Sequence, residues 1–281
     1  MNLETHLAEY KKDGFTVFEK VFNPELMDQW KAKFDDIAER QKKPGEEKAP
    51  KWLRSVTEYE PALMLKAVAN PMILDFAEMV MGPFVQLDNL TFAWFESMSK
   101  QEAEGKVSGW HRDIWAWTPN GSDYIRPNAC NAITYLQDLT DAYGPLRVIR
   151  GSHRDPMLIT PEEKLKPHPR EELVHVKAGD VAFTHCALYH SGTPNTSGDR
   201  RWFFSIYYNL SWLKHRDNHS GPNVQAIIEE ARNKNDRRIM RIFGVDDRVF
   251  GRANSGYHVS DEKMWKQWIV EDEDFGNQGE L

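Results

Sequence analysis

The first third of the chain alternates between helical and extended patterns. Apolar residues recur at helical spacing over residues 3–12, and residues 15–18 then alternate as they do in a strand. Asn23-Pro24 and Asn70-Pro71 each combine a capping side chain with a proline at the first helical position. They predict two further helices, the second of which ends at Gly82-Pro83.

After residue 83 the pattern becomes a series of short β-rich runs separated by turn residues. These runs cover residues 84–95, 110–117, 131–136, 146–149, 173–176, 181–183 and 202–209. Many short strands at this spacing favour a sandwich or barrel over alternating βα units. Helical periodicity returns over residues 224–234 and 262–270. We therefore predict a mainly β fold with flanking helices around a double-sheet barrel.

The length of 281 residues fits a single domain. We expect a helical N-terminal part at 1–83, a core at 84–210 and C-terminal helices at 211–281. The net charge of −7 and the lack of a basic tract argue against nucleic acid as a partner. No run approaches the roughly 20 apolar residues that span a bilayer, so no membrane association is expected. Two cysteines and no visible signal peptide predict a cytoplasmic protein.

The tetrapeptide Trp110-His111-Arg112-Asp113 is the first candidate for chemistry. In an extended strand, the side chains of His111 and Asp113 point to the same face. One further nitrogen would complete the two-histidine, one-carboxylate set that holds iron in non-haem Fe(II) oxygenases. His190 is the best candidate for that nitrogen. Arg201, shortly after it, is a candidate anchor for an acidic cosubstrate, because guanidinium clamps a carboxylate with two parallel bonds.

A bare His-x-Asp is weak evidence, because His-Arg-Asp occurs three times in this chain. The second copy begins at His153, between Gly151-Ser152 and Pro156, and therefore reads as a turn. The third, His215 to Asp217, follows the last predicted strand. We expect both to be solvated surface charge and only the copy at His111 to reach a site.

Four motifs in order give the chain a resemblance to a known family. They are Tyr10 to Val17, the tetrapeptide at Trp110, Gly144-Pro145-Leu146 leading to Gly151-Ser152-His153, and Lys177 to Phe183 leading to His190 and Arg201. In these motifs the chain resembles the phytanoyl-CoA dioxygenase family of Fe(II)- and 2-oxoglutarate-dependent oxygenases. The resemblance implies a double-stranded β-helix (jelly-roll, cupin-like) core. It also implies hydroxylation of a small molecule, with consumption of O2 and release of succinate and CO2.

Carried over by position, the resemblance makes His111, Asp113 and His190 the ligands of Fe(II). Arg201 would bind the distal carboxylate of 2-oxoglutarate. Further cosubstrate contacts are expected from polar residues, namely Asn89, Thr91, Thr134 and Thr193. The alternative for Asn89, Thr91 and Thr134 is that they bond only to one another or to water. The family often has a hydroxyl two residues after the distal histidine, where this chain has Gly192, so Ser191 or Thr193 would have to replace it.

The substrate side is less defined by the sequence. Aromatic and cationic side chains near the predicted strand ends are candidates for substrate contacts, namely Trp115, Trp117, Arg126 and Arg147. The alternative for each is core packing or solvated charge. The protein is expected to be a monomer or homodimer that acts on a small molecule.

A different function for the same barrel is a cupin-like metal site without 2-oxoglutarate chemistry, as in an isomerase or a non-catalytic binding protein. Arg201 argues against it, because such a site does not need a carboxylate clamp at that position.

Overall fold

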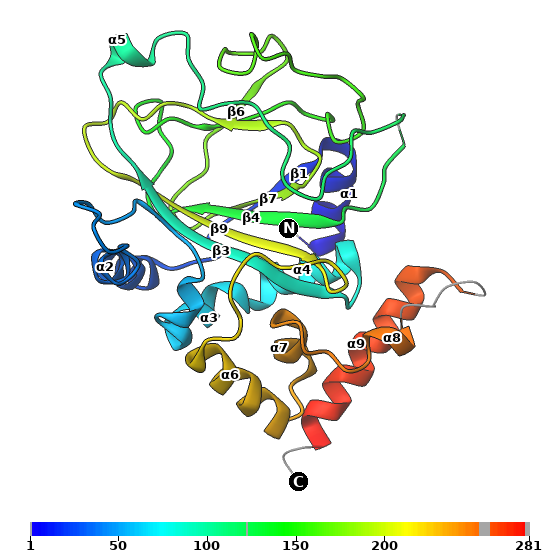
Figure 1. The fold of residues 1–281 in the computed structure, drawn as a ribbon. Helices are drawn as coiled ribbons and strands as arrows, with labels where there is room; N and C mark the ends of the chain where they lie inside the picture. The colour runs from blue at the N-terminus through cyan, green and yellow to red at the C-terminus, as the bar shows by residue number, and fades with distance from the viewer. Residues whose placement is uncertain (1, 122, 253–258, 279–281) are drawn as a thin grey trace. The chain divides into compact units, whose positions relative to one another are not determined.

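The computed structural model describes residues 2–121, 123–252 and 259–278. The chain forms two compact units (Figure 1). Unit 1 comprises Met1–Leu53 and Thr91–Ser205, and unit 2 comprises Arg54–Leu90 and Ile206–Leu281. The strands β3 (Val85–Phe95) and β9 (Arg201–Leu210) each run from one unit into the other. No helix in the described part of the chain is both long enough and apolar enough to cross a membrane.

Unit 1 begins with the helix and strand that the sequence predicts. In α1 (Leu3–Asp13) the side chain of Asn2 accepts a hydrogen bond from the amide of Thr5, which caps the helix. The helix ends at Gly14, whose φ of 86° is readily adopted only by glycine. The chain then enters β1 (Phe15–Phe18), and α2 (Pro24–Arg40) follows with the predicted proline at its start. The cap and the breaker therefore decide where these elements begin and end.

Two antiparallel sheets form the core of unit 1. The larger has the strand order β1-β7-β4-β9-β3-β2, and the smaller has the order β6-β5-β8. The remaining strands are β2 (Trp52–Leu53), β4 (Ala129–Tyr135), β5 (Leu146–Val148), β6 (Glu172–Val174), β7 (Val181–His185) and β8 (His190–Gly192). Apolar residues of β1, β4 and β7 share one buried cluster with residues of β5. The two sheets therefore enclose a common core, as the predicted jelly roll requires.

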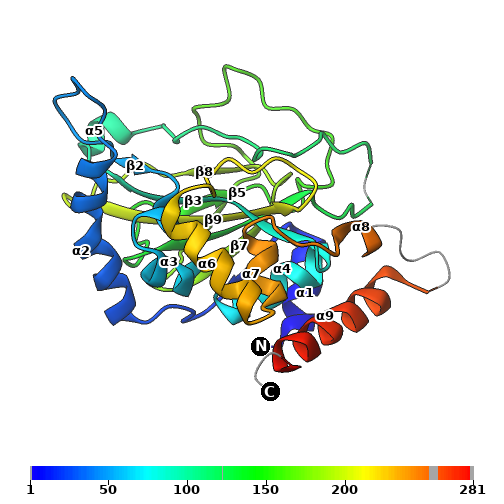
Figure 2. The same cartoon turned by 60° about the horizontal axis from the view of Figure 1, so that its bottom comes forward.

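The helix α2 covers aromatic residues of the larger sheet. Trp30 lies 4.7 Å from Phe204, and Phe34 lies 4.8 Å from Phe92, measured between ring centroids. Both helix residues are fully buried. Burying aromatic side chains of this size stabilises a fold by about 1.5–3 kcal/mol each. After α2 the chain continues into the loop at residues 41–51 (Figure 2).

The prediction of a strand over residues 110–117 is wrong. Only His111 forms a β-bridge, with His190, and the chain then turns. The amide of Asp113 donates to the carbonyl of Cys186, and Trp115 has a φ of 68°, which no strand contains. The aromatic residues that suggested a strand here therefore belong to a loop. Short elements that the pattern did not predict are α5 (Lys100–Ala103), η1 (Val56–Glu58), α3 (Pro61–Val68), α7 (Arg237–Ile242) and α8 (Val249–Arg252).

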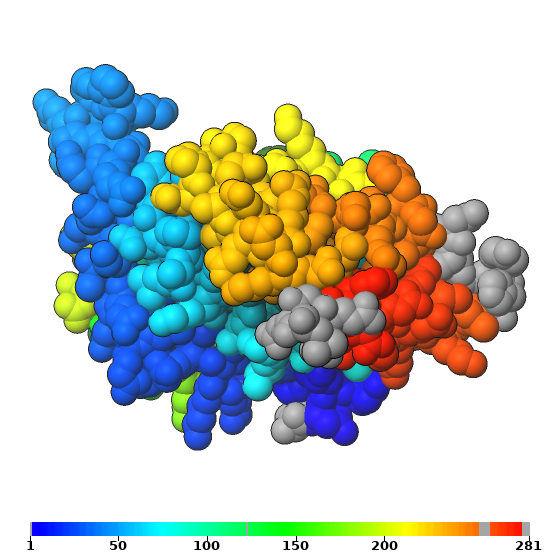
Figure 3. Space-filling view, turned by 90° about the horizontal axis from the view of Figure 1, so that it is seen from below, coloured from blue at the N-terminus to red at the C-terminus, as the bar shows by residue number. Residues whose placement is uncertain are grey.

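Unit 2 contains the helices α3, α4 (Pro71–Met81), α6 (Pro222–Asn233), α7, α8 and α9 (Asp261–Gln278). In Figure 3 the atoms of α6, α7 and α9 are coloured gold, orange and red. The division of the chain into three sequential parts within one domain stays a prediction.

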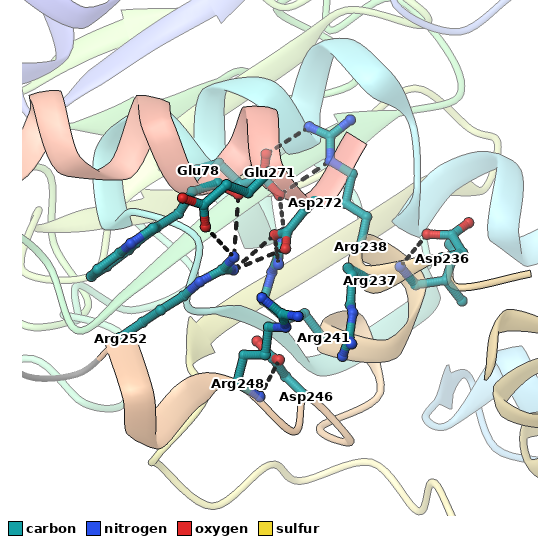
Figure 4. A network of polar contacts seen from close by, with 12 residues as sticks. Glu78, Asp236, Arg237, Arg238, Arg241, Asp246, Arg248, Arg252, Glu271 and Asp272 are labelled. Carbon is teal, nitrogen blue, oxygen red and sulfur yellow. Dashed lines mark hydrogen bonds and ion pairs between the residues drawn. The ribbon is translucent and has the colours of Figure 1, made fainter. Parts of the chain in front are cut away.

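Charged side chains are buried between the helices of unit 2 (Figure 4). Glu78 of α4 is 2% exposed and accepts hydrogen bonds from Arg238 and Arg241 of α7. Arg241 also pairs with Asp272 of α9, which in turn pairs with Arg252. A buried ion is tolerated only when its partners replace the water that it has lost. This network therefore ties α4, α7 and α9 together and depends on every member.

Candidate metal and cosubstrate site

Three ligating side chains of unit 1 meet at one point. His111 and His190 exchange both backbone hydrogen bonds at 3.1 Å, which sets their imidazole centroids 4.3 Å apart. Oδ1 of Asp113 lies 3.7 Å from Nε2 of His111 and 3.8 Å from Nε2 of His190. All three ligand atoms lie within 4.8 Å of one another. Two imidazole nitrogens and one carboxylate oxygen suit a divalent transition metal.

Both imidazoles are oriented for ligation by hydrogen bonds on their far sides. Nδ1 of His111 lies 2.9 Å from the carbonyl of Gly109, and Nδ1 of His190 lies 3.1 Å from the carbonyl of Leu188. Because a carbonyl only accepts, each Nδ1 must carry the hydrogen, and each Nε2 keeps its lone pair for a metal. The neighbouring imidazole of His190 and burial lower the pKa of His111. This shift favours the neutral imidazole, which is the form that ligates a metal.

The site is buried on one side and open on the other. The side chain of His190 is 7% exposed, whereas that of His111 is 50% exposed. A metal held here would thus keep positions that small molecules can reach.

Arg201, the first residue of β9, is 3% exposed and fixed by backbone carbonyls. Its Nη1 donates to the carbonyls of Tyr143 and Gly144 at 3.0 Å and of Thr193 at 2.5 Å. Its guanidinium lies 4.8 Å from the ring centre of Phe95. Burial lowers the pKa of Arg201, yet a guanidinium stays charged in proteins. Nε has no partner among the described residues, so the group is held in place with donor capacity to spare.

Gly192 leaves space beside this guanidinium. A Cβ at residue 192 would lie 3.0 Å from Oγ of Ser108 and 3.4 Å from Nη2 of Arg201. The amide of Ser108 donates to the carbonyl of Gly192 at 2.9 Å, which fixes the serine there. Sequence reasoning missed Ser108, because it lies in a polar connection more than 80 residues before Gly192 and no local pattern points to it.

The two hydroxyls expected beside Gly192 have other partners. Oγ of Ser191 accepts from the amide of Gly109 at 3.0 Å, and Oγ1 of Thr193 accepts from Nε of Arg147 at 2.8 Å. Arg147 also pairs with Glu171. Thr193 and Arg147 therefore bind each other in this structure. Their expected roles toward cosubstrate and substrate stay predictions.

Other residues expected to contact the cosubstrate also have protein partners. Asn89 belongs to unit 2, where its Nδ2 donates to Asp217 at 2.5 Å. Thr134 donates to the carbonyl of Asp180 at 2.7 Å. Thr91 lies buried on β3. These bonds engage polar groups of Asn89 and Thr134, and their roles toward the cosubstrate stay predictions.

The aromatic candidates for the substrate side lie on the loop after Asp113. Trp117 is 79% exposed, whereas Trp115 is half-buried and its Nε1 has no partner within the described residues. Nδ2 of Asn128 donates to the carbonyl of Trp115 at 3.2 Å, which supports the left-handed backbone there. Arg126, farther along, is exposed. Roles in substrate binding stay predictions for all three candidates.

The expectation that the later His-Arg-Asp copies are solvated is wrong for two of their residues. His153 is 3% exposed, its Nε2 lies 3.1 Å from the carbonyl of Lys11, and burial lowers its pKa to about 4. Asp217 is also 3% exposed and accepts from the amides of Ser55 and Leu90. Both are structural hydrogen-bonding groups. A turn does not have to be exposed when other segments supply its polar partners.

A jelly roll with a buried histidine, an open histidine and a carboxylate around one point defines the class of mononuclear metal-binding barrels. The model of the phytanoyl-CoA dioxygenase (PhyH) family matches residues 10–203, and the chain belongs to this family. The predicted family membership and the predicted jelly-roll fold are thereby confirmed.

Two relatives of known activity are similar to this chain. L-proline trans-4-hydroxylase of Streptomyces griseoviridis is 27% identical over 174 residues, which cover 51% of this chain and 62% of that protein. The match thus spans less than two thirds of that relative. Ectoine dioxygenase of Bordetella parapertussis is 23% identical over 234 residues, covering 72% of this chain and 74% of that enzyme.

Solved structures share the fold. HygX from Streptomyces hygroscopicus, solved with nickel and 2-oxoglutarate bound, has a TM-score of 0.60 and 16% identity, covering 76% of this chain and 90% of that chain. The α-ketoglutarate-dependent epimerase SnoN from nogalamycin biosynthesis has a TM-score of 0.55 and 21% identity, covering 74% and 81%.

Proposed function

We propose that this protein is an Fe(II)/2-oxoglutarate-dependent dioxygenase that hydroxylates a small molecule. The observation that supports it most is the presence, in one unit, of the candidate metal ligands His111, Asp113 and His190 and of the buried guanidinium of Arg201. The Nε of that guanidinium has no partner in the part of the chain that the structure describes. A metal barrel without 2-oxoglutarate chemistry does not need a carboxylate clamp at this position. The names of the relatives support the same chemistry.

The residues present fit the metal and the cosubstrate. Fe(II) would be held by Nε2 of His111, Nε2 of His190 and Oδ1 of Asp113. Together with 2-oxoglutarate and O2, it supplies the power to oxidise an unactivated C–H bond, with release of succinate and CO2. The task of the protein is to bind, orient and keep water away.

Each part of the site has a physical task in this scheme. Arg201 supplies a fixed positive charge for the distal carboxylate of 2-oxoglutarate, and its burial strengthens that attraction. Oγ of Ser108 faces the same space beside Gly192 and is placed to donate a second hydrogen bond. Asp113 keeps a carboxylate in the ligand set, which favours hydroxylation over halogenation. The exposed side of His111 leaves a path for the substrate.

The test is an anaerobic titration followed by visible absorption. Protein free of metal receives Fe(II) and then 2-oxoglutarate. We expect a charge-transfer band that requires both additions and reports chelation of an open iron site. Iron binding without such a band would contradict the proposal and support a metal barrel without 2-oxoglutarate chemistry.

A further inference from the structure

The two oxygens of the Asp113 carboxylate have different surroundings. Oδ1 faces both histidines, at 3.7 Å from His111 and 3.8 Å from His190. Oδ2 accepts a hydrogen bond of 3.3 Å from Nδ2 of Asn131. The carboxylate is therefore divided into an oxygen directed at the metal position and an oxygen held by the protein.

Asn131 is itself fixed by a second side chain. It lies on β4 and is 5% exposed, and its Oδ1 accepts from Oγ of Ser205 at 2.7 Å. Ser205 lies on the neighbouring strand β9 and is 7% exposed. Because the amide oxygen takes the serine hydrogen, the amide nitrogen is the end left to face Asp113. Ser205 therefore donates to Asn131, and Asn131 donates to the carboxylate of Asp113.

We propose that Asn131, oriented by Ser205, is a positioning residue that makes Asp113 a one-oxygen ligand. By holding Oδ2, the amide prevents the carboxylate from rotating to bind the metal with both oxygens. A carboxylate that bound through both would occupy a position needed by the cosubstrate or by oxygen. The amide is neutral, so it satisfies Oδ2 without cancelling the negative charge that Oδ1 brings to the metal.

This inference rests on the proposed function in one respect, which is the reason why a position on the metal must stay open for the cosubstrate or oxygen. The geometry itself concerns any divalent metal at this set. A purely structural role for Asn131, that of a buried amide that joins two strands, predicts a loss of stability and no change at the metal.

The experiment compares Asn131→Ala and Ser205→Ala with a matched control, Thr184→Val. Thr184 donates to the backbone carbonyl of Asn131 at 3.3 Å and is fully buried, so the control removes a similar bond that is not directed at Asp113. Each folded variant is titrated with Co(II), which reports both its affinity and, through its visible absorption, its coordination. Chemical unfolding measures the stability of each.

We expect Asn131→Ala to weaken Co(II) binding by about 10- to 100-fold, because the carboxylate of Asp113 is no longer held in its ligating orientation. The Co(II) spectrum should change as well, because both oxygens of the carboxylate can then approach the metal. Ser205→Ala should act in the same direction with a smaller effect, and Thr184→Val should change neither. Wild-type affinity and spectrum in both Asn131→Ala and Ser205→Ala would overturn the proposal. Should Asn131→Ala not fold, the Ser205→Ala comparison decides alone.

A second readout separates this proposal from the proposed function. If wild-type protein with Fe(II) forms the 2-oxoglutarate band while Asn131→Ala and Ser205→Ala both bind Co(II) unchanged, the positioning role fails and the function stands. If wild-type protein forms no band but Asn131→Ala alters Co(II) binding, the function fails and the positioning role stands.

Discussion

The assignment of Arg201 can be tested by removing its charge while keeping most of its volume. Arg201→Met retains apolar packing against Phe95 but cannot donate hydrogen bonds. If the guanidinium clamps a carboxylate, the variant loses two charge-assisted bonds of about 1.5 kcal/mol each. Their sum, about 3 kcal/mol, corresponds to a roughly 150-fold weaker Kd for 2-oxoglutarate.

The same substitution has a cost in stability that must be measured separately. Three carbonyls, those of Tyr143, Gly144 and Thr193, lose the donor Nη1. At about 1 kcal/mol per bond, we expect the free energy of unfolding to fall by up to about 3 kcal/mol. Circular dichroism and urea unfolding would establish that the variant is folded at the assay temperature.

The assay is calorimetric titration of 2-oxoglutarate into Ni(II)-loaded protein, together with a Ni(II) titration of the metal-free form. Arg200→Met is the matched control, because Arg200 is the adjacent arginine, is half-exposed and stacks on Trp94 at 4.2 Å. We expect the control to bind 2-oxoglutarate normally and both variants to bind Ni(II) normally. An equal loss of Ni(II) and 2-oxoglutarate affinity in folded Arg201→Met, or no loss of 2-oxoglutarate affinity, would refute the reasoning.

Three further predictions concern stability. The pKa of His153 is about 4 in the fold and near 6.5 unfolded, so the unfolded state binds more protons as pH falls between these values and stability decreases. From pH 7 to 5 this histidine should lower the free energy of unfolding by about 2 kcal/mol, a loss that His153→Gln should not show. The same pH dependence of the free energy of unfolding in wild type and His153→Gln, measured by urea unfolding, would contradict this prediction. Glu78→Gln should cost about 3–5 kcal/mol, because it leaves buried arginines short of a counter-charge, whereas Glu230→Gln in an exposed pair should leave the thermal midpoint unchanged. Equal midpoints for both would show that the network does not stabilise unit 2. Gly14→Ala should destabilise the protein more than Gly45→Ala, although both glycines have a φ of 86°. Only at Gly14 would a Cβ meet other atoms, those of His153 at 2.6 Å and Leu188 at 2.8 Å. Equal losses of stability in the two variants would contradict the steric argument.

Local features of the sequence determined much of the fold. The asparagine caps, the prolines after them and the glycine breakers act within a few residues, so they predict α1, α2 and α4 close to their observed bounds. The β-rich runs between turn residues likewise predict β3, β4 and β9, because strand-favouring side chains and turn residues both act within a short segment of the chain.

The candidate site was also predicted in part from the sequence and decided in part by the tertiary structure. His111, Asp113, His190 and Arg201 could be proposed because the donor types and their order match a family pattern, and the structure does bring the three ligands together. The route was different from the one expected, since a single bridge and a turn, not a strand, aim His111 and Asp113.

Only the tertiary structure decided which partner each polar side chain meets. Ser108 faces the space beside Gly192, and Asn131 reaches Asp113 with Ser205 behind it. These contacts join residues that are distant in sequence, through hydrogen bonds that form only after the strands have paired. Local periodicity reports the face on which a residue lies, whereas a hydrogen bond depends on the position of a second residue from another segment.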